Sequence, residues 1–378
     1  MMSTFKYVKN WTLGLILLIG MPLAAQDNTL QLEDLDPSKF DLDFTYYDQS
    51  TAIFLAQLSA LVYYEKGDLD VRMNILRLMY PESDIRYAFL KEPDKSTPLG
   101  ENASSKRKKS NTQSELMFFG TKDFAVIVYR GSYSVKDWRT DLRMSTVGSQ
   151  TPKEDSLYRG LPKGHEGFRQ SLENLMVYEN LFDRLEEFIG HYTKDVSSFP
   201  VYLTGHSLGA ALATLTIKPL TYGGQFKFGG CYTFAPAMTV ACDATDVFEE
   251  ESFLIHNIVN YVDLITRANY KKLAHVGNYY RLSKYDKKSC TEDDGLLYAE
   301  NERVVPFKFG ESLNIFGNVL LYHRLDSYIE RLRLPANRED KVKERGVDQS
   351  CFVHTLNPKK NRLPCLSKKE AKRLKKNK

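Results

Sequence analysis

The sequence of 378 residues has little of several features that mark particular classes of protein. Its five cysteines and seven histidines form no CxxC pair and no cluster with metal-ligand spacing, so we expect neither a metal nor a bound cofactor. Beyond the N-terminus no apolar run is long enough to cross a bilayer, which argues against a multi-spanning membrane protein. The hydrophobic content of 42% is that of a globular chain with a sizeable core.

Positive and negative charges are also nearly balanced, with 52 lysines and arginines against 48 aspartates and glutamates. The net charge of +4 comprises +2 in residues 1–25, +6 in residues 366–378 and −4 in the body between them. A nucleic-acid-binding domain carries positive charge on its folded body, so we expect no nucleic-acid partner. The basic end of the chain is either a solvated tail or a contact for an anionic membrane or envelope surface.

One long apolar run is present, at the N-terminus. Lys6 and Lys9 precede it, and it ends in small residues near Ala25. This pattern predicts a signal peptide over residues 1–25, and therefore an exported protein that is secreted or stays in the periplasm or envelope. Since the run is short for a membrane-spanning helix, an uncleaved anchor is the weaker alternative.

Export permits disulfide bonds, and the number of cysteines is odd. At least one cysteine is therefore unpaired within the chain. Cys231 lies in a strand-like run, where a buried thiol is expected. The pairing of the others stays open: Cys242, Cys290, Cys351 and Cys365.

The composition divides the chain behind the signal peptide into three parts. Residues 26–45 are polar and acidic and are expected to be loose. Residues 46–335 contain no convincing linker and are expected to form one domain, and residues 336–378 a basic C-terminal tail.

Periodicity predicts that strands alternate with helices from Arg86 onward. This alternation predicts an α/β fold with a mostly parallel central sheet and helices on both faces. Helical patterns cover 46–80, 164–192 and 321–334, and strand patterns cover 115–120, 124–132, 201–206, 226–237, 254–267 and 276–282.

A serine between two glycines follows the strand pattern "VYL" and precedes the helical pattern "AALATL". The pentapeptide Gly205–Gly209 has the form G-x-S-x-G, and strand–turn–helix is the context that a nucleophile elbow requires. The elbow is a tight turn that lifts the Ser207 hydroxyl above the sheet, and side chains at Gly205 and Gly209 would collide in it. The following helix directs its N-terminus at a developing oxyanion.

A serine nucleophile needs a base, and the base needs an orienting acid. In this fold the chain order is serine, then aspartate or glutamate, then histidine. Asp263 directly follows an apolar strand and is the stronger acid candidate, whereas Asp243 and Asp246 lie in a more polar stretch. Position alone leaves the base open among His275, His323 and His354.

Seven short motifs then occur in a recognisable order. They are AVIVYRGSYSVKDWRTDL (125–142), GHEGF (164–168), LTGHSLGAALATL (203–215), FAPA (234–237), NYVDLITR (260–267), HVGNYYRL (275–282) and YHRLDSY (322–328). Together they resemble the class 3, fungal-type lipases, a family with the α/β-hydrolase fold and a nucleophile elbow. The resemblance covers about residues 50–335.

The resemblance implies a role for each matching position. It makes Ser207 the nucleophile, Asp263 the orienting acid and His323 the base. It places the oxyanion hole at the backbone N–H groups of Leu208 and Ser132, with the Ser132 hydroxyl assisting. Supporting or core roles follow for His206, His275, Arg130, Asp141 and Trp138, although Trp138 is equally suited to a substrate platform; His354 lies beyond the matching region.

Two departures from the family pattern concern the surroundings of the site. The stretch after Asp263 lacks the family's usual proline. The family's lid corresponds to residues 132–142, which are charged here and lack the apolar face that an oil surface needs. Residues 304–323 are richer in apolar residues and either shape an acyl pocket or pack on the sheet.

The expected activity is hydrolysis of carboxylic ester bonds of lipids through an acyl-enzyme. The alternatives within enzymes are a phospholipase A1 and a carboxylesterase for short-chain or aryl esters. The non-enzymatic alternative is a hydrolase-fold scaffold used for binding, since fold alone does not determine function.

Overall fold

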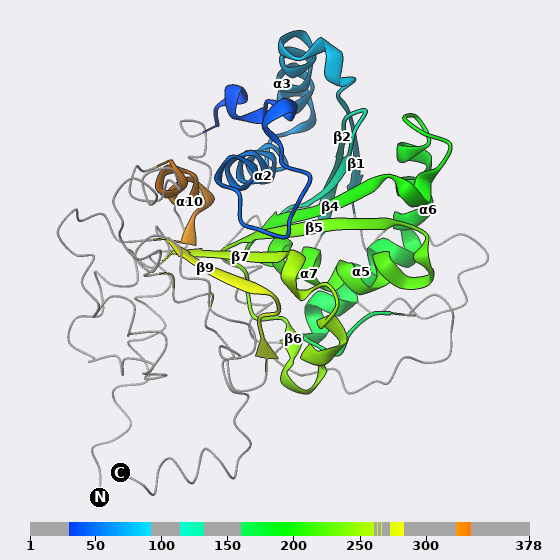
Figure 1. Ribbon diagram of the computed structural model, residues 1–378, viewed down its shortest axis with the longest axis vertical. Coiled ribbons are helices and arrows are strands. Elements are labelled where there is room, and N and C mark those ends of the chain that lie inside the picture. Colours follow the sequence, from blue (N-terminus) through cyan, green and yellow to red (C-terminus); the bar gives the residue numbers. More distant parts are fainter. Residues whose placement is uncertain are drawn as a thin grey trace, which may run out of the picture.

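The computed structural model describes residues 30–91, 114–131, 160–260, 263, 266, 273–282 and 323–333. Their centre is a seven-stranded sheet with helices on both faces (Figure 1). Its strand order is β1 (Arg86–Lys91), β2 (Glu115–Gly120), β3 (Ala125–Tyr129), β4 (Pro200–His206), β5 (Lys227–Phe234), β7 (Ile255–Asn260) and β9 (Asn278–Leu282). β1, β2 and β3 pair antiparallel, whereas β3 to β9 pair parallel.

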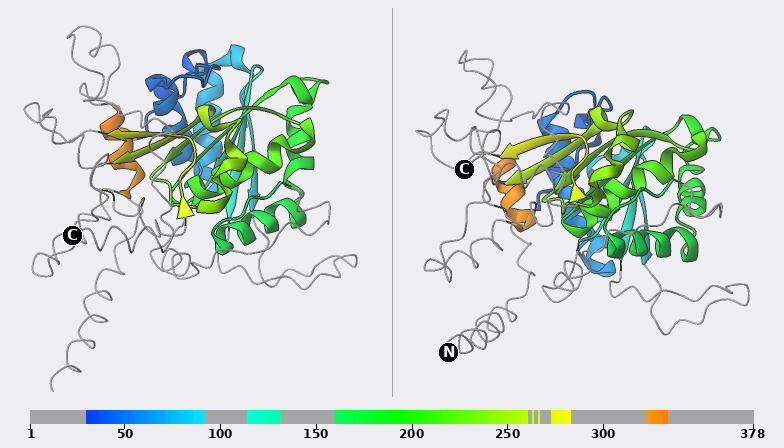
Figure 2. Two further views of the ribbon diagram at one scale, coloured as in Figure 1. Left: turned by 60° about the horizontal axis from the view of Figure 1, so that its bottom comes forward. Right: turned by 90° about the horizontal axis from the view of Figure 1, so that it is seen from below.

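Six helices cover the two faces of the sheet in the described part of the chain (Figures 1 and 2). One face carries α2 (Gln49–Leu61), α3 (Lys66–Met79) and α10 (Leu325–Leu332). The other carries α5 (Glu166–Tyr178), α6 (Leu181–Ile189) and α7 (Leu208–Thr221). A separate short pair joins β6 (Val240–Ala241) to β8 (Leu273–Ala274).

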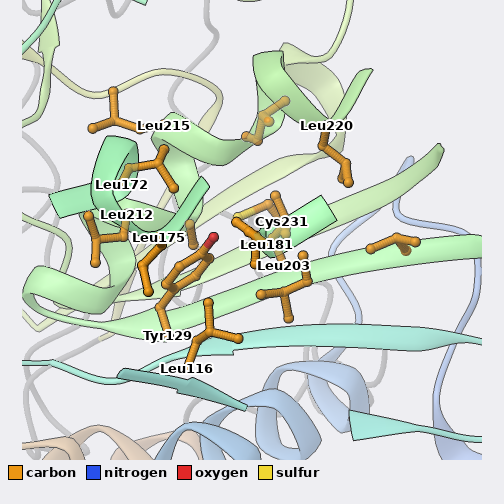
Figure 3. Packing of buried hydrophobic residues seen from close by; sticks show 14 of the residues in the cluster. Leu116, Tyr129, Leu172, Leu175, Leu181, Leu203, Leu212, Leu215, Leu220 and Cys231 are labelled. Atoms are coloured by element: carbon orange, nitrogen blue, oxygen red, sulfur yellow. The ribbon is translucent and has the colours of Figure 1, made fainter. Parts of the chain in front are cut away.

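The parallel strands are buried on both sides, as strands between two helix layers must be. β3 and β7 have every residue buried, and each layer of helices closes its own hydrophobic core. Figure 3 shows the core under α5, α6 and α7, where leucines of the helices meet Tyr129, Leu203 and Cys231 of the sheet. The mostly parallel sheet and the tight strand-to-helix connection from β4 to α7 confirm the predicted α/β-hydrolase fold.

The prediction that residues 26–45 are loose is wrong for the described part of that segment. Residues 30–45 contain two 3₁₀ turns, Leu32–Leu35 and Pro37–Lys39, and bury Leu35, Phe40 and Phe44 against the sheet. The ring of Phe40 stacks on Phe124 with the ring centroids 4.2 Å apart. Burial of each phenylalanine side chain stabilises the fold by roughly 1.5–3 kcal/mol. This stabilisation explains why the segment packs on the sheet although most of its residues are polar.

Two predicted helices are each divided in two. Residues 46–80 form α2 and α3, and residues 164–192 form α5 and α6. Between α5 and α6, Asn180 adopts a left-handed conformation with φ 50° and ψ 48°. Asparagine reaches this region more readily than most residues, so it can end one helix and start another without interrupting the apolar periodicity.

Cys231 is a buried free thiol on β5, as predicted, and burial raises its pKa. Cys242 is disulfide-bonded. In the described part of the chain no helix has the length and apolarity needed to cross a membrane. The signal peptide at 1–25 and the tail at 336–378 lie outside the described residues and stay predictions.

Candidate active site

The nucleophile elbow is formed by the end of β4 and the start of α7. Ser207 stands between them with φ 57° and ψ −116°, a conformation that a residue with a side chain rarely adopts. A Cβ atom at Gly205 would lie 2.5 Å from the carbonyl carbon of Gly209, and one at Gly209 would lie 2.3 Å from the carbonyl oxygen of Tyr129. The two glycines therefore let three backbone segments meet under the serine.

Ser207, His323 and Asp263 lie in one hydrogen-bonded row. His323 Nδ1 is 2.8 Å from Asp263 Oδ2, and His323 Nε2 is 2.8 Å from Ser207 Oγ. Because a carboxylate only accepts, Nδ1–H donates to Asp263, which leaves the Nε2 lone pair to accept the serine proton. Asp263 is fully buried and the other two are nearly so, so little water competes for these hydrogen bonds.

The elements that carry the acid and the base bring them together from distant parts of the chain. Asp263 lies in a turn after β7, and its backbone N–H donates to Asn260 O at 3.1 Å. On the other side of Asp263, the Thr266 hydroxyl donates to Asp263 O at 2.9 Å. That bond stabilises the backbone at the place where the family's proline is missing. His323 lies just before α10, which packs against α2 on the opposite side of the sheet from α7.

Tyr328 is a site residue that the sequence did not reveal. Its hydroxyl donates to Asp263 Oδ2 at 2.7 Å and accepts the backbone N–H of Asn260 at 3.0 Å. It therefore holds the buried carboxylate that orients His323. Tyr328 lies on α10, five residues after the base. This position could indicate a role in the site only after His323 had been identified as the base.

The remaining predicted residues have separate places. Leu208 is the first residue of α7, so its N–H points out of the helix N-terminus, as an oxyanion donor requires. Arg130 forms an ion pair with Glu115 of β2, in keeping with a supporting role. Ser132, Asp141 and Trp138, with the segments 132–142 and 304–322 and His354, lie outside the described residues.

The other histidine and acid candidates are engaged elsewhere. His275 Nε2 donates to Thr266 O at 2.8 Å, and burial lowers the pKa of His275 to about 4. Asp243 pairs with Lys163 at 2.5 Å and is largely exposed. Among the described residues, no group of three or more histidines, cysteines or carboxylates could hold a metal ion.

Comparison with known proteins points to one family. Residues 126–272 match the model of the family "Lipase (class 3)", a span that includes Ser207 and Asp263 and ends before His323. A Saccharomyces cerevisiae protein, LIH1, whose name assigns it provisionally to the lipases, is 30% identical over 179 residues. That alignment covers 42% of this chain and 50% of the relative, so the chain matches about half of the relative's length.

Solved lipase structures are also similar. The nonglycosylated LIP2 lipase of Yarrowia lipolytica has a TM-score of 0.47 at 16% identity and covers 63% of this chain and 82% of its own. The triacylglyceride lipase of Rhizomucor miehei has a TM-score of 0.38 at 20% identity, with 45% of this chain and 62% of its own covered. Over residues 126–272 the chain matches the class 3 lipases, and the resemblance that its motifs predict is confirmed.

Proposed function

We propose that this protein is an exported serine hydrolase that cleaves carboxylic ester bonds of lipids through an acyl-enzyme intermediate. The observation that carries the proposal is the row Ser207–His323–Asp263 at a strained elbow, with 2.8 Å at both hydrogen bonds of His323. The match to the class 3 lipase family over residues 126–272 supports an ester rather than another acyl substrate.

In the first half of the proposed reaction, Ser207 Oγ attacks the carbonyl carbon of the ester while His323 Nε2 takes its proton. The carbonyl oxygen becomes an oxyanion, which the backbone N–H groups of Leu208 and Ser132 would stabilise. The carbon–oxygen bond to the alcohol then breaks, and His323 returns the proton to the leaving oxygen. The products of this half are the free alcohol and an ester of Ser207.

Water completes the cycle by the same route. His323 takes a proton from water, the hydroxide oxygen attacks the acyl carbon, and Ser207 leaves with the proton held by His323. Asp263 accepts Nδ1–H throughout, so it keeps the imidazole in the tautomer whose Nε2 faces the serine. Since Tyr328 binds the same carboxylate oxygen at 2.7 Å, it restricts the rotation of Asp263 during both halves.

The lipid part of the proposal rests on the family match, because the reaction itself needs only an ester. A phospholipase A1 or a carboxylesterase for short-chain or aryl esters would use the same three residues. The predicted signal peptide supports export, and the basic tail 366–378 supports a contact with an anionic surface.

A series of p-nitrophenyl esters with increasing acyl length tests the activity and chooses among these substrates. We expect hydrolysis by the protein and its loss, by at least about 10³-fold, in the Ser207→Ala variant. An optimum at long acyl chains favours a lipase, and an optimum at short chains favours an esterase. Equal rates for the two proteins would overturn the serine mechanism.

A further inference from the structure

A second buried histidine, His206, lies beside the nucleophile and bonds to the base. It is 4% exposed, and its Nε2 is 2.7 Å from the backbone oxygen of His323. Its Nδ1 is 3.2 Å from the hydroxyl of Tyr63, which follows α2. The proposed reaction uses neither side chain, although both ring nitrogens of His206 are engaged within the site.

The chemistry of the partners determines the direction of each hydrogen bond. A carbonyl oxygen only accepts, so His206 Nε2 carries the proton and donates it to His323 O. Nδ1 is then a lone pair and accepts from the Tyr63 hydroxyl. Burial, followed by the neighbouring His323, lowers the pKa of His206 to about 3, which keeps the ring neutral and this order intact.

Gly131 brings the end of the oxyanion strand into the same contact. A Cβ atom at this position would lie 2.2 Å from the Tyr63 hydroxyl oxygen and 2.6 Å from the backbone oxygen of His206. Only glycine therefore permits this approach. Gly131 also directly precedes Ser132, which the family resemblance makes an oxyanion donor.

Three backbone segments of the site thus meet at two side chains. The series runs from Gly131, which lies against the Tyr63 hydroxyl, through Tyr63 and His206 to the carbonyl of His323, and Ser207 is the residue next to His206. We propose that Tyr63 and His206 are positioning residues that hold the base and the oxyanion strand in register with the nucleophile. This inference rests on the proposed serine hydrolase function.

The physical reason for such a role is the position of His323. Asp263 fixes its ring from the side-chain end, and His206 fixes its peptide from the backbone end. With only one attachment the ring could tilt, and a displacement of about 1 Å at a reacting group costs up to about 100-fold in rate.

Tyr63→Phe is the first test, because it removes one hydroxyl and preserves the ring. We expect kcat for a p-nitrophenyl ester to fall by about tenfold, as for one lost buried hydrogen bond, with KM within about twofold of its original value. Tyr202→Phe is the matched control. It also removes one tyrosine hydroxyl, which donates to Leu42 O at 2.7 Å at the far end of β4. Its kcat should stay within about twofold of the original.

Two substitutions at His206 test the bond to the base. His206→Gln places an amide N–H where Nε2 stood and can donate to His323 O, whereas His206→Leu cannot. We expect the Gln variant to retain more of kcat than the Leu variant by about tenfold. If His206→Leu fails to fold, Tyr63→Phe still decides the question. In ¹⁵N-histidine spectra at pH 7, His206 of the unaltered protein should be the neutral tautomer protonated at Nε2.

The outcomes separate this inference from the proposed function. An active parent with an unchanged Tyr63→Phe variant, or with His206 protonated at Nδ1, overturns the positioning role and leaves the serine mechanism standing. A parent that neither hydrolyses esters nor reacts with a fluorophosphonate at Ser207 overturns the proposed function, and the positioning role with it. A selective loss of kcat in Tyr63→Phe, with recovery by Gln over Leu at position 206, supports both.

Discussion

His256 should make the protein lose stability as the pH falls. It is fully buried on β7, where Nε2 donates to Phe44 O at 2.8 Å and Nδ1 accepts from the Tyr280 hydroxyl at 2.9 Å. Burial lowers the pKa of His256 from 6.5 to about 4, although the bond to Phe44 acts in the opposite direction. Protonation of His256 would leave the Nε2 bond to Phe44 O in place, but it would place a charge in the buried site and remove the Nδ1 lone pair that accepts from Tyr280.

The sign and size follow from the two pKa values. Between pH 6.5 and 4 the unfolded chain binds a proton at this histidine and the folded chain does not, so acid favours unfolding. This stability is fully present above pH 6.5 and is lost as the pH falls toward the folded-state value of about 4. From pH 7.5 to 5 the loss of unfolding free energy from this one residue is about 2 kcal/mol.

Denaturant unfolding at pH 7.5 and pH 5 measures this loss. The control is His256→Gln, whose amide N–H can still donate to Phe44 O but does not titrate. Other buried histidines contribute equally to both proteins, so the difference between the two pH dependences isolates His256. We expect the variant to lose about 2 kcal/mol less than the parent over this range. Equal losses in the two proteins would refute the reasoning.

Three further substitutions have defined outcomes. Tyr328→Phe removes the 2.7 Å donor to Asp263, and since hydrogen bonds to charged groups contribute roughly 1.5–3 kcal/mol, kcat/KM for a p-nitrophenyl ester should fall at least about tenfold. Gly205→Ala would place a methyl group 2.5 Å from a backbone carbon of α7, so circular dichroism melting should show a loss of more than about 10 °C or no folded protein. Asp34→Ala removes a partly exposed ion pair with Arg333 and the acceptor of the buried Gln57 amide, so its melting temperature should fall by about 2–8 °C.

The elbow could be predicted from the sequence because its requirements are local. Fifteen residues contain a run of strand-forming residues, the two glycines around Ser207 and a helical pattern. The backbone strain at Ser207 is a consequence of the tight turn between the strand and the helix. Asp263 could also be predicted from the sequence, since it directly follows an apolar strand pattern. His323 required the family resemblance, because three downstream histidines fit the chain order equally well.

The rest depends on contacts between residues far apart in the chain. The bond between Tyr63 and His206 spans 143 positions, and the one between Tyr328 and Asp263 spans 65. No local pattern marks either pair. The packing of residues 30–45 is equally non-local, because a polar stretch becomes ordered only when the sheet offers its phenylalanines a buried face.

The central claim is that Ser207 is a nucleophile activated by His323. The most direct measurement is reaction of the folded protein with a fluorophosphonate, followed by mass spectrometry of the peptides. We expect one adduct, on Ser207, that is absent from Ser207→Ala and forms at least about 10³-fold more slowly in His323→Ala. An adduct elsewhere, or none on the folded parent protein, would contradict it.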